Sequence, residues 1–451
     1  DISLNVGANE KVTSVGGVIG SAGKVNNKAT NNKLAYYCIV ENCVNNGKVS
    51  YCCLSQGQQL YYGGVAGATH AKVISCKNNG TVTFSAETEQ IKPTLYMAGI
   101  AGVSSGDFTD CHNVGTLTID NIDFGYWVGL AGITGRCVNT PAMTVSDCTN
   151  SGKIQVDFTA SGNQVHNVAG LVAIATDGNI SILNCHNTGE ITMTTPGTGA
   201  CGAQIGGIAA KITKPGTVEN CTNTVTITLN MSAIEKIGQS AGTNRIRIAG
   251  IVGATRGDIK NCTNTGTIEC FARTSTRAAQ KATCNKNYSV SPGGITGGQM
   301  DYGDTKDIGM DVRNCVNEGA VVVDADVDGN NSTVGGIVSH PGYEGTENTN
   351  TIENCINKGN ITVTGAGKFR VGGINGGMAN VKGCENQGTV KLATNNKGAN
   401  GNSCVAGISG YMGKSMKHQN NKNYGDVIEE TDLAHFVAGL IADFNDLAAT
   451  Y

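Results

Sequence analysis

The chain is built from a repeat that recurs about every 38 residues along its 451 residues. The first half of each repeat contains a small residue in most copies, then a glycine, then valine, isoleucine or leucine. This glycine occurs at Gly17, Gly64, Gly99, Gly129, Gly170, Gly207, Gly250, Gly294, Gly336, Gly373, Gly407 and Gly439. A unit this short cannot bury its own apolar face, so the copies must stack on one another to form one continuous core.

The second half of the repeat carries a cysteine and, two positions later, an asparagine. A clean copy, Ile259–Ile268, has the pattern aliphatic-x-Asn-Cys-x-Asn-x-Gly-x-aliphatic. The cysteines are Cys43, Cys76, Cys111, Cys148, Cys185, Cys221, Cys262, Cys315, Cys355 and Cys384. The asparagines are Asn45, Asn78, Asn113, Asn150, Asn187, Asn223, Asn264, Asn317, Asn357, Asn386 and Asn423. Asn421 replaces the cysteine in the eleventh copy, and Val225 replaces the glycine in one other copy.

These two halves predict an all-β, right-handed parallel β-helix, or β-solenoid, of about 12 coils with three short strands per coil. The expected strands are a glycine-rich one such as 248–253, one that leads into the cysteine such as 218–221, and an alternating one such as 226–229. The handedness follows from the general bias of parallel crossovers. The whole chain, 1–451, is expected to be a single solenoid, with 1–15 as an N-terminal cap or continuation and 443–451 as a C-terminal cap or truncation.

Stacked coils turn each repeated side chain into a ladder with a spacing of about 4.8 Å. Asparagines at a turn can hydrogen-bond to one another along such a stack. Ladder cysteines are too far apart for a disulfide, so we expect free, buried thiols. Zinc is the alternative, although the ladder lacks the C-x₂₋₄-C spacing. Cys270 and Cys284 flank the longest insertion and are the candidate disulfide pair.

Charge and hydropathy exclude several classes of protein. The chain has 32 Lys and Arg against 35 Asp and Glu, a net charge of −3, which argues against binding nucleic acid by phosphate neutralisation. The longest apolar run, 124–133, is shorter than the ~20 residues of a membrane-spanning helix. The start carries no basic segment followed by an apolar one, so no signal peptide is expected.

Several copies resemble the GLUG motif. The resemblance is carried by segments such as Gly250–Gly253, Gly129–Gly132 and Gly294–Gly297, and by second halves such as Ile259–Cys262. The resemblance extends over nearly the whole chain. The chain departs from the usual GLUG pattern because it has Cys and Asn at the turn. The resemblance implies a secreted or surface-exposed, adhesin-like β-solenoid, chiefly bacterial. It supplies no catalytic residue.

Two acidic patterns are candidates for chemistry. Asp324, Asp326, Asp328 and Asn330 match the first half of a calcium loop, but Gly335 stands where the closing glutamate belongs, so a solvated acidic turn is the alternative. Apart from this calcium site, no cofactor is expected.

Asp110 and Asp147 precede ladder cysteines in consecutive coils. They are weak candidates for the paired carboxylates of a polysaccharide-degrading enzyme. The alternative is that each aspartate simply replaces the asparagine found there in most copies.

Histidines and threonines give weaker signals. The seven histidines are scattered, so each is predicted to be a turn or surface residue. Outward threonine pairs such as Thr226 and Thr228 are typical of an ice-binding lattice, but charged residues such as Glu269 interrupt the array. The pattern favours an ordinary exposed strand.

The favoured interpretation is a non-catalytic protein, extracellular or at the cell surface, whose loops bind a glycan or a protein. The expected contact sites are the insertions at 134–144, 230–244, 271–291 and 300–311, because loops carry variation on a rigid scaffold. One alternative is a structural subunit of an extracellular filament or surface lattice that associates end to end. A second is a polysaccharide-degrading β-helix enzyme. No nucleic-acid partner and no membrane insertion are expected.

Overall fold

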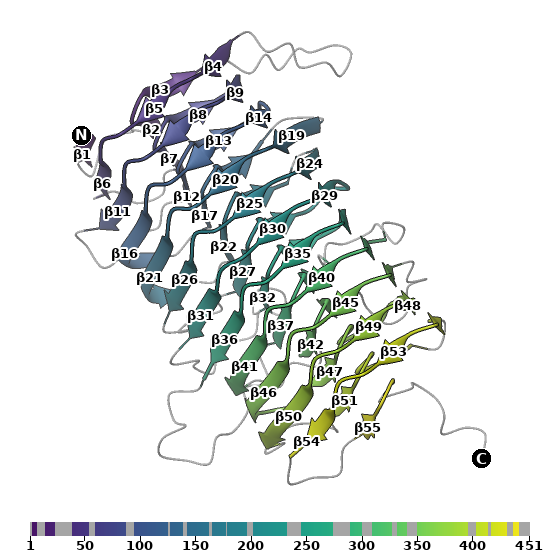
Figure 1. The fold of residues 1–451 in the computed structure, drawn as a ribbon. Helices are drawn as coiled ribbons and strands as arrows, with labels where there is room; N and C mark the ends of the chain where they lie inside the picture. Colours follow the sequence, from purple (N-terminus) through teal and green to yellow (C-terminus); the bar gives the residue numbers. More distant parts are fainter. Residues whose placement is uncertain are drawn as a thin grey trace.

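The chain folds into an elongated all-β solenoid (Figure 1). The structure is a computed structural model, which describes residues 2–6, 14–22, 38–53, 59–86, 94–124, 127–138, 142–161, 165–176, 178–195, 202–231, 245–273, 289–299, 309–326, 332–340, 350–395, 403–413, 416–430 and 436–441. These residues contain strands and turns but no helix, and thus no helix able to span a membrane.

The strands form five parallel sheets, named here A to E, that run along the solenoid. Sheet A contains β1 (Ile2–Val6), β6 (Val49–Cys53), β11 (Val82–Ala86), β16 (Leu117–Phe124), β21 (Ile154–Ser161), β26 (Ile191–Thr195), β31 (Ile227–Met231), β36 (Ile268–Ala272), β41 (Val321–Asp326), β46 (Ile361–Ala366), β50 (Val390–Asn395) and β54 (Val427–Glu429). Sheet B contains β2 (Ser14–Gly16), β7 (Gln59–Gly63), β12 (Thr94–Ala98), β17 (Val128–Ala131), β22 (Val165–Ala169), β27 (Gly202–Gly206), β32 (Arg245–Ala249), β37 (Ser289–Gly293), β42 (Thr333–Gly335), β47 (Arg370–Gly372), β51 (Cys404–Ala406) and β55 (Phe436–Ala438).

The other three sheets are built from shorter strands. Sheet C contains β3 (Ile19–Ala22), β8 (Ala66–Thr69), β13 (Ala101–Ser104), β18 (Thr134–Cys137), β23 (Val172–Ala175), β28 (Ala209–Ile212), β33 (Val252–Thr255), β38 (Thr296–Gly298) and β43 (Val338–His340). Sheet D contains β4 (Ile39–Glu41), β9 (Lys72–Ile74), β14 (Phe108–Thr109), β19 (Ala142–Ser146), β24 (Asn179–Leu183), β29 (Thr217–Glu219), β34 (Asp258–Lys260), β39 (Asp311–Arg313), β44 (Thr351–Glu353), β48 (Asn380–Lys382) and β52 (His418–Gln419). Sheet E contains β5 (Val44–Asn45), β10 (Lys77–Asn78), β15 (His112–Asn113), β20 (Thr149–Asn150), β25 (His186–Asn187), β30 (Thr222–Asn223), β35 (Thr263–Asn264), β40 (Val316–Asn317), β45 (Ile356–Asn357), β49 (Glu385–Asn386) and β53 (Lys422–Asn423).

Nine coils, from β2 to β46, pass through the sheets in the order B, C, D, E, A, and the two coils from β47 to β54 pass through B, D, E and A. The expectation of three strands per coil is therefore wrong. The predicted strand 248–253 is divided between β32 and β33, because the chain bends at Gly250 and Ile251. The turn around Cys262 contributes a separate two-residue strand, β35. Strands of two to four residues separated by bends are too short to be detected from an alternation of apolar and polar residues.

The cross-section has four packed layers. One core cluster joins sheets A and B, for example through Val82 and Leu95. A second joins sheets C and D, for example through Ala101 and Phe108. A smaller cluster lies between sheets B and C and includes Tyr96. The layers are therefore stacked in the order A, B, C, D, and sheet E connects D to A at one edge.

Buried residues alternate with less buried ones over the first four residues of every sheet-A strand from β6 to β50, as the sequence predicts. The residues of β31 alternate between buried and half-buried from Ile227 to Met231. Its register with β26 and β36 keeps equivalent residues side by side. The buried side chains of each sheet-A strand therefore stack on the equivalent side chains of the next coil.

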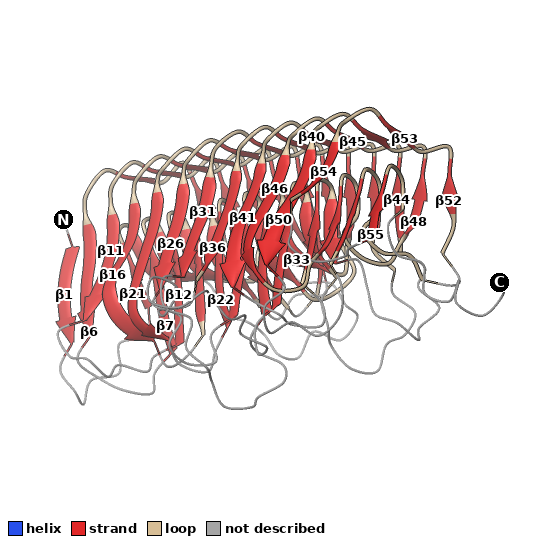
Figure 2. Ribbon diagram, turned by 90° about the horizontal axis from the view of Figure 1, so that it is seen from below, coloured by secondary structure: helices blue, strands red, loops and turns tan. Residues whose placement is uncertain are grey.

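The two edges of the cross-section differ. We call the edge at sheet E the closed edge; there two residues join D to E and three join E to A in every coil. The opposite edge, the open edge, carries the connections from A to B and from C to D. The A-to-B connections vary from three residues (162–164) to sixteen (273–288). Figure 2 shows the regular turns of the closed edge in a row along one side of the solenoid.

Candidate functional site

The repeated asparagines form a continuous hydrogen-bonded ladder inside the closed edge, as predicted. Asn264 donates from Nδ2 to Oδ1 of Asn317 in the next coil at 2.8 Å, and accepts from Nδ2 of Asn223 at 2.8 Å. The same contact links every consecutive pair from Asn45 to Asn423, at 2.7–2.8 Å. The ladder therefore satisfies buried amides that would otherwise be costly.

The motif glycine packs against this ladder. A Cβ at Gly250 would overlap the side-chain amide of Asn264 and the carbonyl oxygen of Gly294. The equivalent contact in the fourth coil involves Gly132 and Asn150, so the motif glycine of that copy is Gly132 and not Gly129. The two halves of the repeat thus touch across the interior of each coil.

The residue before each ladder cysteine adopts the left-handed conformation, which the sequence pattern did not reveal. Its φ is +52° to +57° at the Asn and Asp positions, +48° at Ser75 and +62° at Gly383. Asn, Asp and Gly tolerate this conformation best. Their repeated use here therefore meets a backbone requirement.

This requirement also accounts for Asp110 and Asp147. Asp110 accepts a hydrogen bond from Ser75 Oγ at 2.9 Å and lies 3.0 Å from His112 Nε2. Asp147 accepts from Asn184 Nδ2 at 3.2 Å. Both aspartates hold turn positions on the outside of the closed edge.

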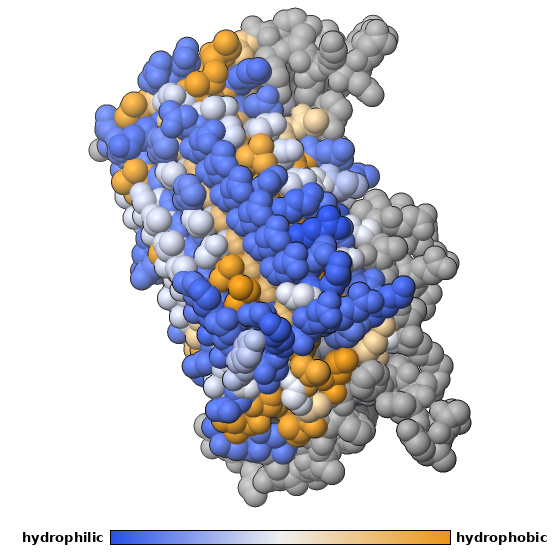
Figure 3. Space-filling model, turned by 45° about the vertical axis from the view of Figure 1, so that its right-hand side comes forward, coloured by the Kyte–Doolittle hydropathy of each residue, from blue (hydrophilic) through white to orange (hydrophobic). Residues whose placement is uncertain are grey.

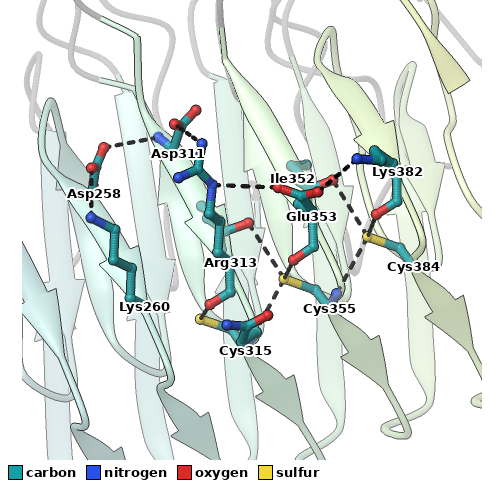
Figure 4. A network of polar contacts seen from close by, with 12 residues as sticks. Asp258, Lys260, Asp311, Arg313, Cys315, Ile352, Glu353, Cys355, Lys382 and Cys384 are labelled. Carbon is teal, nitrogen blue, oxygen red and sulfur yellow. Dashed lines mark hydrogen bonds and ion pairs between the residues drawn. The ribbon is translucent and has the colours of Figure 1, made fainter. Parts of the chain in front are cut away.

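The ladder cysteines from Cys76 to Cys384 are buried, free thiols whose sulfurs lie inside the turn (Figure 4). Cys355 Sγ donates to the carbonyl oxygens of Glu353, at 3.3 Å, and Val312, at 3.5 Å. It also accepts from the backbone N–H of Cys315 at 3.5 Å. Burial raises the pKa of Cys315 and Cys355 well above the usual thiol value. These thiols act as small hydrogen-bonding core residues.

Asn421 shows that hydrogen bonding matters at this position. It accepts from the backbone N–H of Cys384 at 2.9 Å and donates to Val381 O at 2.9 Å. Asparagine therefore reproduces both roles of the thiol at the last step of the ladder.

The outer face of sheet D carries balanced charges (Figure 4). Glu353 pairs with Lys382 at 3.0 Å and with Arg313 at 3.6 Å. Lys260 pairs with Asp258 at 3.1 Å. Hydrophilic residues cover the middle of the face in Figure 3. Exposed pairs of this kind leave little net field.

The acidic segment does not gather into a metal centre where it is described. Asp324 lies in β41 and pairs with Arg273 at 2.9 Å, whereas Asp326 is fully buried. Asp328 and Asn330 lie outside the described residues. Within the described ranges, no group of three or more His, Cys, Asp or Glu could hold a metal ion.

Cys270 is a free and fully buried thiol in sheet A. Its position contrasts with the loop staple suggested by the sequence. Its expected partner, Cys284, lies outside the described residues.

The strands that flank the four predicted insertions have their nearer ends at the open edge. Most of 134–144 is regular structure, because β18 and β19 leave only 138–141 between them. Residues 232–244, 274–288 and 300–308 lie outside the described residues.

A group of cationic side chains between sheets B and C escaped the sequence analysis. It includes Lys211 and Arg247, which are 4% and 2% exposed, and the half-buried Arg136. His340 is also buried here, and His166 is buried between sheets A and B beside Phe158. The prediction that every histidine is a turn or surface residue is therefore wrong for these two. The signal that could have found the group is Arg245-Ile246-Arg247-Ile248, a strand with charge on the side away from the aliphatic row.

The family comparison agrees with this geometry. A family model described as the GLUG motif matches residues 244–269. The chain carries the GLUG motif. The match runs from the start of β32 into β36 and contains both Gly250 and Asn264, so the motif spans one bend, one ladder step and the contact between them. Searches of curated proteins and of solved structures found no match.

Proposed function

We propose that this GLUG-motif solenoid is a non-catalytic binding scaffold that acts outside the cell or at its surface. The observation that carries the proposal is the confinement of variable connections to the open edge, while the closed edge keeps constant turns and an unbroken asparagine ladder. In binding proteins with a rigid scaffold, the residues that contact the ligand commonly lie in variable loops of this kind. The proposed ligand is a glycan or a protein.

The test shortens one long connection without changing the scaffold. Residues 232–244 would be replaced by the three-residue connection 367–369, which joins β46 to β47. The ligand would come from a glycan array and a panel of cell-surface proteins. We expect the variant to keep its melting temperature within a few degrees and to lose at least tenfold in affinity. Lys358→Met serves as the control, because Lys358 lies at the closed edge, where it pairs with Glu318 at 2.8 Å, and it should leave the affinity unchanged. Unchanged affinity after every open-edge connection has been shortened would refute the proposal.

A second candidate, a subunit that associates end to end, has its own observation. Among the residues that the structure describes, eight large hydrophobic residues are exposed, and seven of them lie in the first or last coils: Ile2, Val18, Ile39, Val44, Tyr424, Val437 and Leu440. The hydrophobic residues visible in Figure 3 gather toward its two ends. Each end face therefore fits a further coil of the same repeat, which a second copy could supply.

The ladder also has a direction. Each asparagine donates to the next coil and accepts from the previous one, so stacked copies would join head to tail. Negative-stain electron microscopy across a concentration series tests this candidate. Filaments with a regular axial repeat are expected, and isolated rods at every concentration would refute it.

A further inference from the structure

A threonine, a histidine and an aspartate are linked by hydrogen bonds on the outside of the closed edge. His112 Nδ1 lies 2.8 Å from Oγ1 of Thr149, its register partner in the next coil. His112 Nε2 lies 3.0 Å from Oδ1 of Asp110, two positions earlier in the chain. The three residues, named here the closed-edge triad, thus have the order of a nucleophile, a general base and the group that orients the base.

The carboxylate decides which nitrogen of the ring carries the proton. An ionised carboxylate only accepts hydrogen bonds, so Nε2–H of the neutral His112 ring donates to Asp110. Nδ1 is then unprotonated, and the hydroxyl of Thr149 donates to it. Ser75 Oγ donates to Asp110 Oδ2 at 2.9 Å and so holds the carboxylate from its other side. The basic nitrogen of the ring is therefore directed at Thr149.

The asparagine ladder fixes the two coils of the triad relative to each other. Asn113 follows His112 and Asn150 follows Thr149 in the chain, and Asn113 Nδ2 donates to Asn150 Oδ1 at 2.7 Å. The ring and the hydroxyl therefore meet without a change of conformation. The side chains of His112 and Asp110 are 34% and 54% exposed, and Thr149 is half-buried, so a small molecule in solution can reach the triad.

Two further threonines of sheet E provide comparisons within the same protein. His186 Nδ1 lies 2.7 Å from Oγ1 of its register partner Thr222. The residue two positions before His186 is Asn184, whose amide can donate as well as accept and so does not select one tautomer. Thr263 lies between Thr222 and Val316 in register. The sheet thus offers a threonine beside a histidine with a carboxylate, one beside a histidine alone, and one between a threonine and a valine.

We propose that Thr149 is a modification site that accepts an acyl group from an activated ester, with His112 as its general base and Asp110 as the positioning residue. Thr149 Oγ1 forms a bond to the carbonyl carbon of the ester while its proton passes to His112 Nδ1. The bond from that carbon to the leaving oxygen then breaks, and Nδ1 returns the proton to the leaving alcohol. Asp110 accepts from Nε2–H throughout and stabilises the transient imidazolium.

The products are an ester on Thr149 and the free alcohol of the donor. The step consumes the hydroxyl, so each chain is modified once and no turnover is required. The inference goes beyond the proposed binding function and does not depend on it.

The test treats the full chain with p-nitrophenyl acetate and follows acetylation of each threonine by peptide mass spectrometry. We expect Thr149 to be acetylated at least about tenfold faster than Thr263, with Thr222 between them. His112→Gln should lower the rate at Thr149 to that at Thr263. Asp110→Asn should lower it to that at Thr222 without affecting the fold, because asparagine occupies this turn position in most copies.

Asn184→Asp is the matched gain-of-function variant. It places a carboxylate two positions before His186, as Asp110 stands two positions before His112, and it should raise the rate at Thr222 toward that at Thr149. Equal acetylation of the three threonines, or an unchanged rate at Thr149 in His112→Gln, would overturn the inference. If His112→Gln lowers the melting temperature by more than a few degrees, Asp110→Asn and Asn184→Asp decide: unchanged rates at Thr149 and Thr222 in these two variants would also overturn it.

Discussion

Gly250 packs directly against the side-chain amide of Asn264, fourteen positions later in the same coil. The asparagine is held there by hydrogen bonds to the coils on either side. The bend at Gly250 can approach the ladder only without a Cβ. This contact explains why the two halves of the repeat occur together in the chain.

We expect Gly250→Ala to lower the free energy of unfolding by about 3 kcal/mol, because the new methyl group overlaps Asn264 and the backbone of Gly294. The matched control is Gly439→Ala. Gly439 holds the same motif position in the last described coil, but nothing lies within 4 Å of its Cβ site. Urea unfolding of both variants checks the prediction, and equal effects would contradict it.

Asn264→Ala should lower the free energy of unfolding by about 3 kcal/mol, because it leaves Asn223 and Asn317 without their buried partner. An asparagine that makes the same contact on the exposed surface should contribute less to the free energy of unfolding. Asn79 also donates to an asparagine of a neighbouring coil, Asn46, at 2.8 Å, but in solvent, so Asn79→Ala should cost less than about 0.5 kcal/mol. Hydrogen exchange should show loss of protection on both sides of Asn264; protection unchanged there would count against the ladder.

The left-handed turn position predicts an unusual order of tolerance. Asn261 has a φ of +53°, so Asn261→Gly should change the free energy of unfolding by less than about 0.5 kcal/mol. Asn261→Val should lower it by about 1–2 kcal/mol, because a β-branched residue is strained there. Thermal and urea unfolding check this order. A valine variant as stable as the glycine variant would show that the turn relaxes to another conformation.

Stability should fall at alkaline pH. Burial raises the pKa of Cys270 to about 12, whereas an unfolded thiol titrates near 8.5. The folded state then binds more protons, so the stabilisation is complete below about pH 8.5 and is lost as pH rises toward 12.

Cys270→Val should remove this part of the pH dependence, because the side chain lies between Leu229 and Val323 and cannot ionise as valine. Between pH 7 and pH 10, the free energy of unfolding of the wild-type protein should fall by about 2 kcal/mol more than that of the valine variant. Parallel pH profiles of the two proteins would contradict the prediction.

The repeat itself was predictable because every coil must bury the same residues in the same place. Because the coils stack, a cysteine and an asparagine that recur at a fixed spacing must each form a ladder. The alternation at 226–229 predicts that one face of sheet A is buried. The asparagine ladder and the solenoid followed from this local pattern. The register of the fourth copy did not, because the segment 128–133 offers both Gly129 and Gly132, and only contact with Asn150 distinguishes them.

The sequence by itself determined that the chain stacks repeats into a parallel β-solenoid, because short units with one apolar face have no other way to bury it. Only the tertiary structure decided how many strands each coil contains and which sheet packs against the second face of sheet B. Alternation places Arg245 and Arg247 opposite the core residues Ile246 and Ile248, which in a simple coil would mean solvent. In a four-layered coil that face packs on sheet C, so Arg247 is buried and Arg245 is half-buried. The layer order depends on contacts between distant residues, and no local pattern records them.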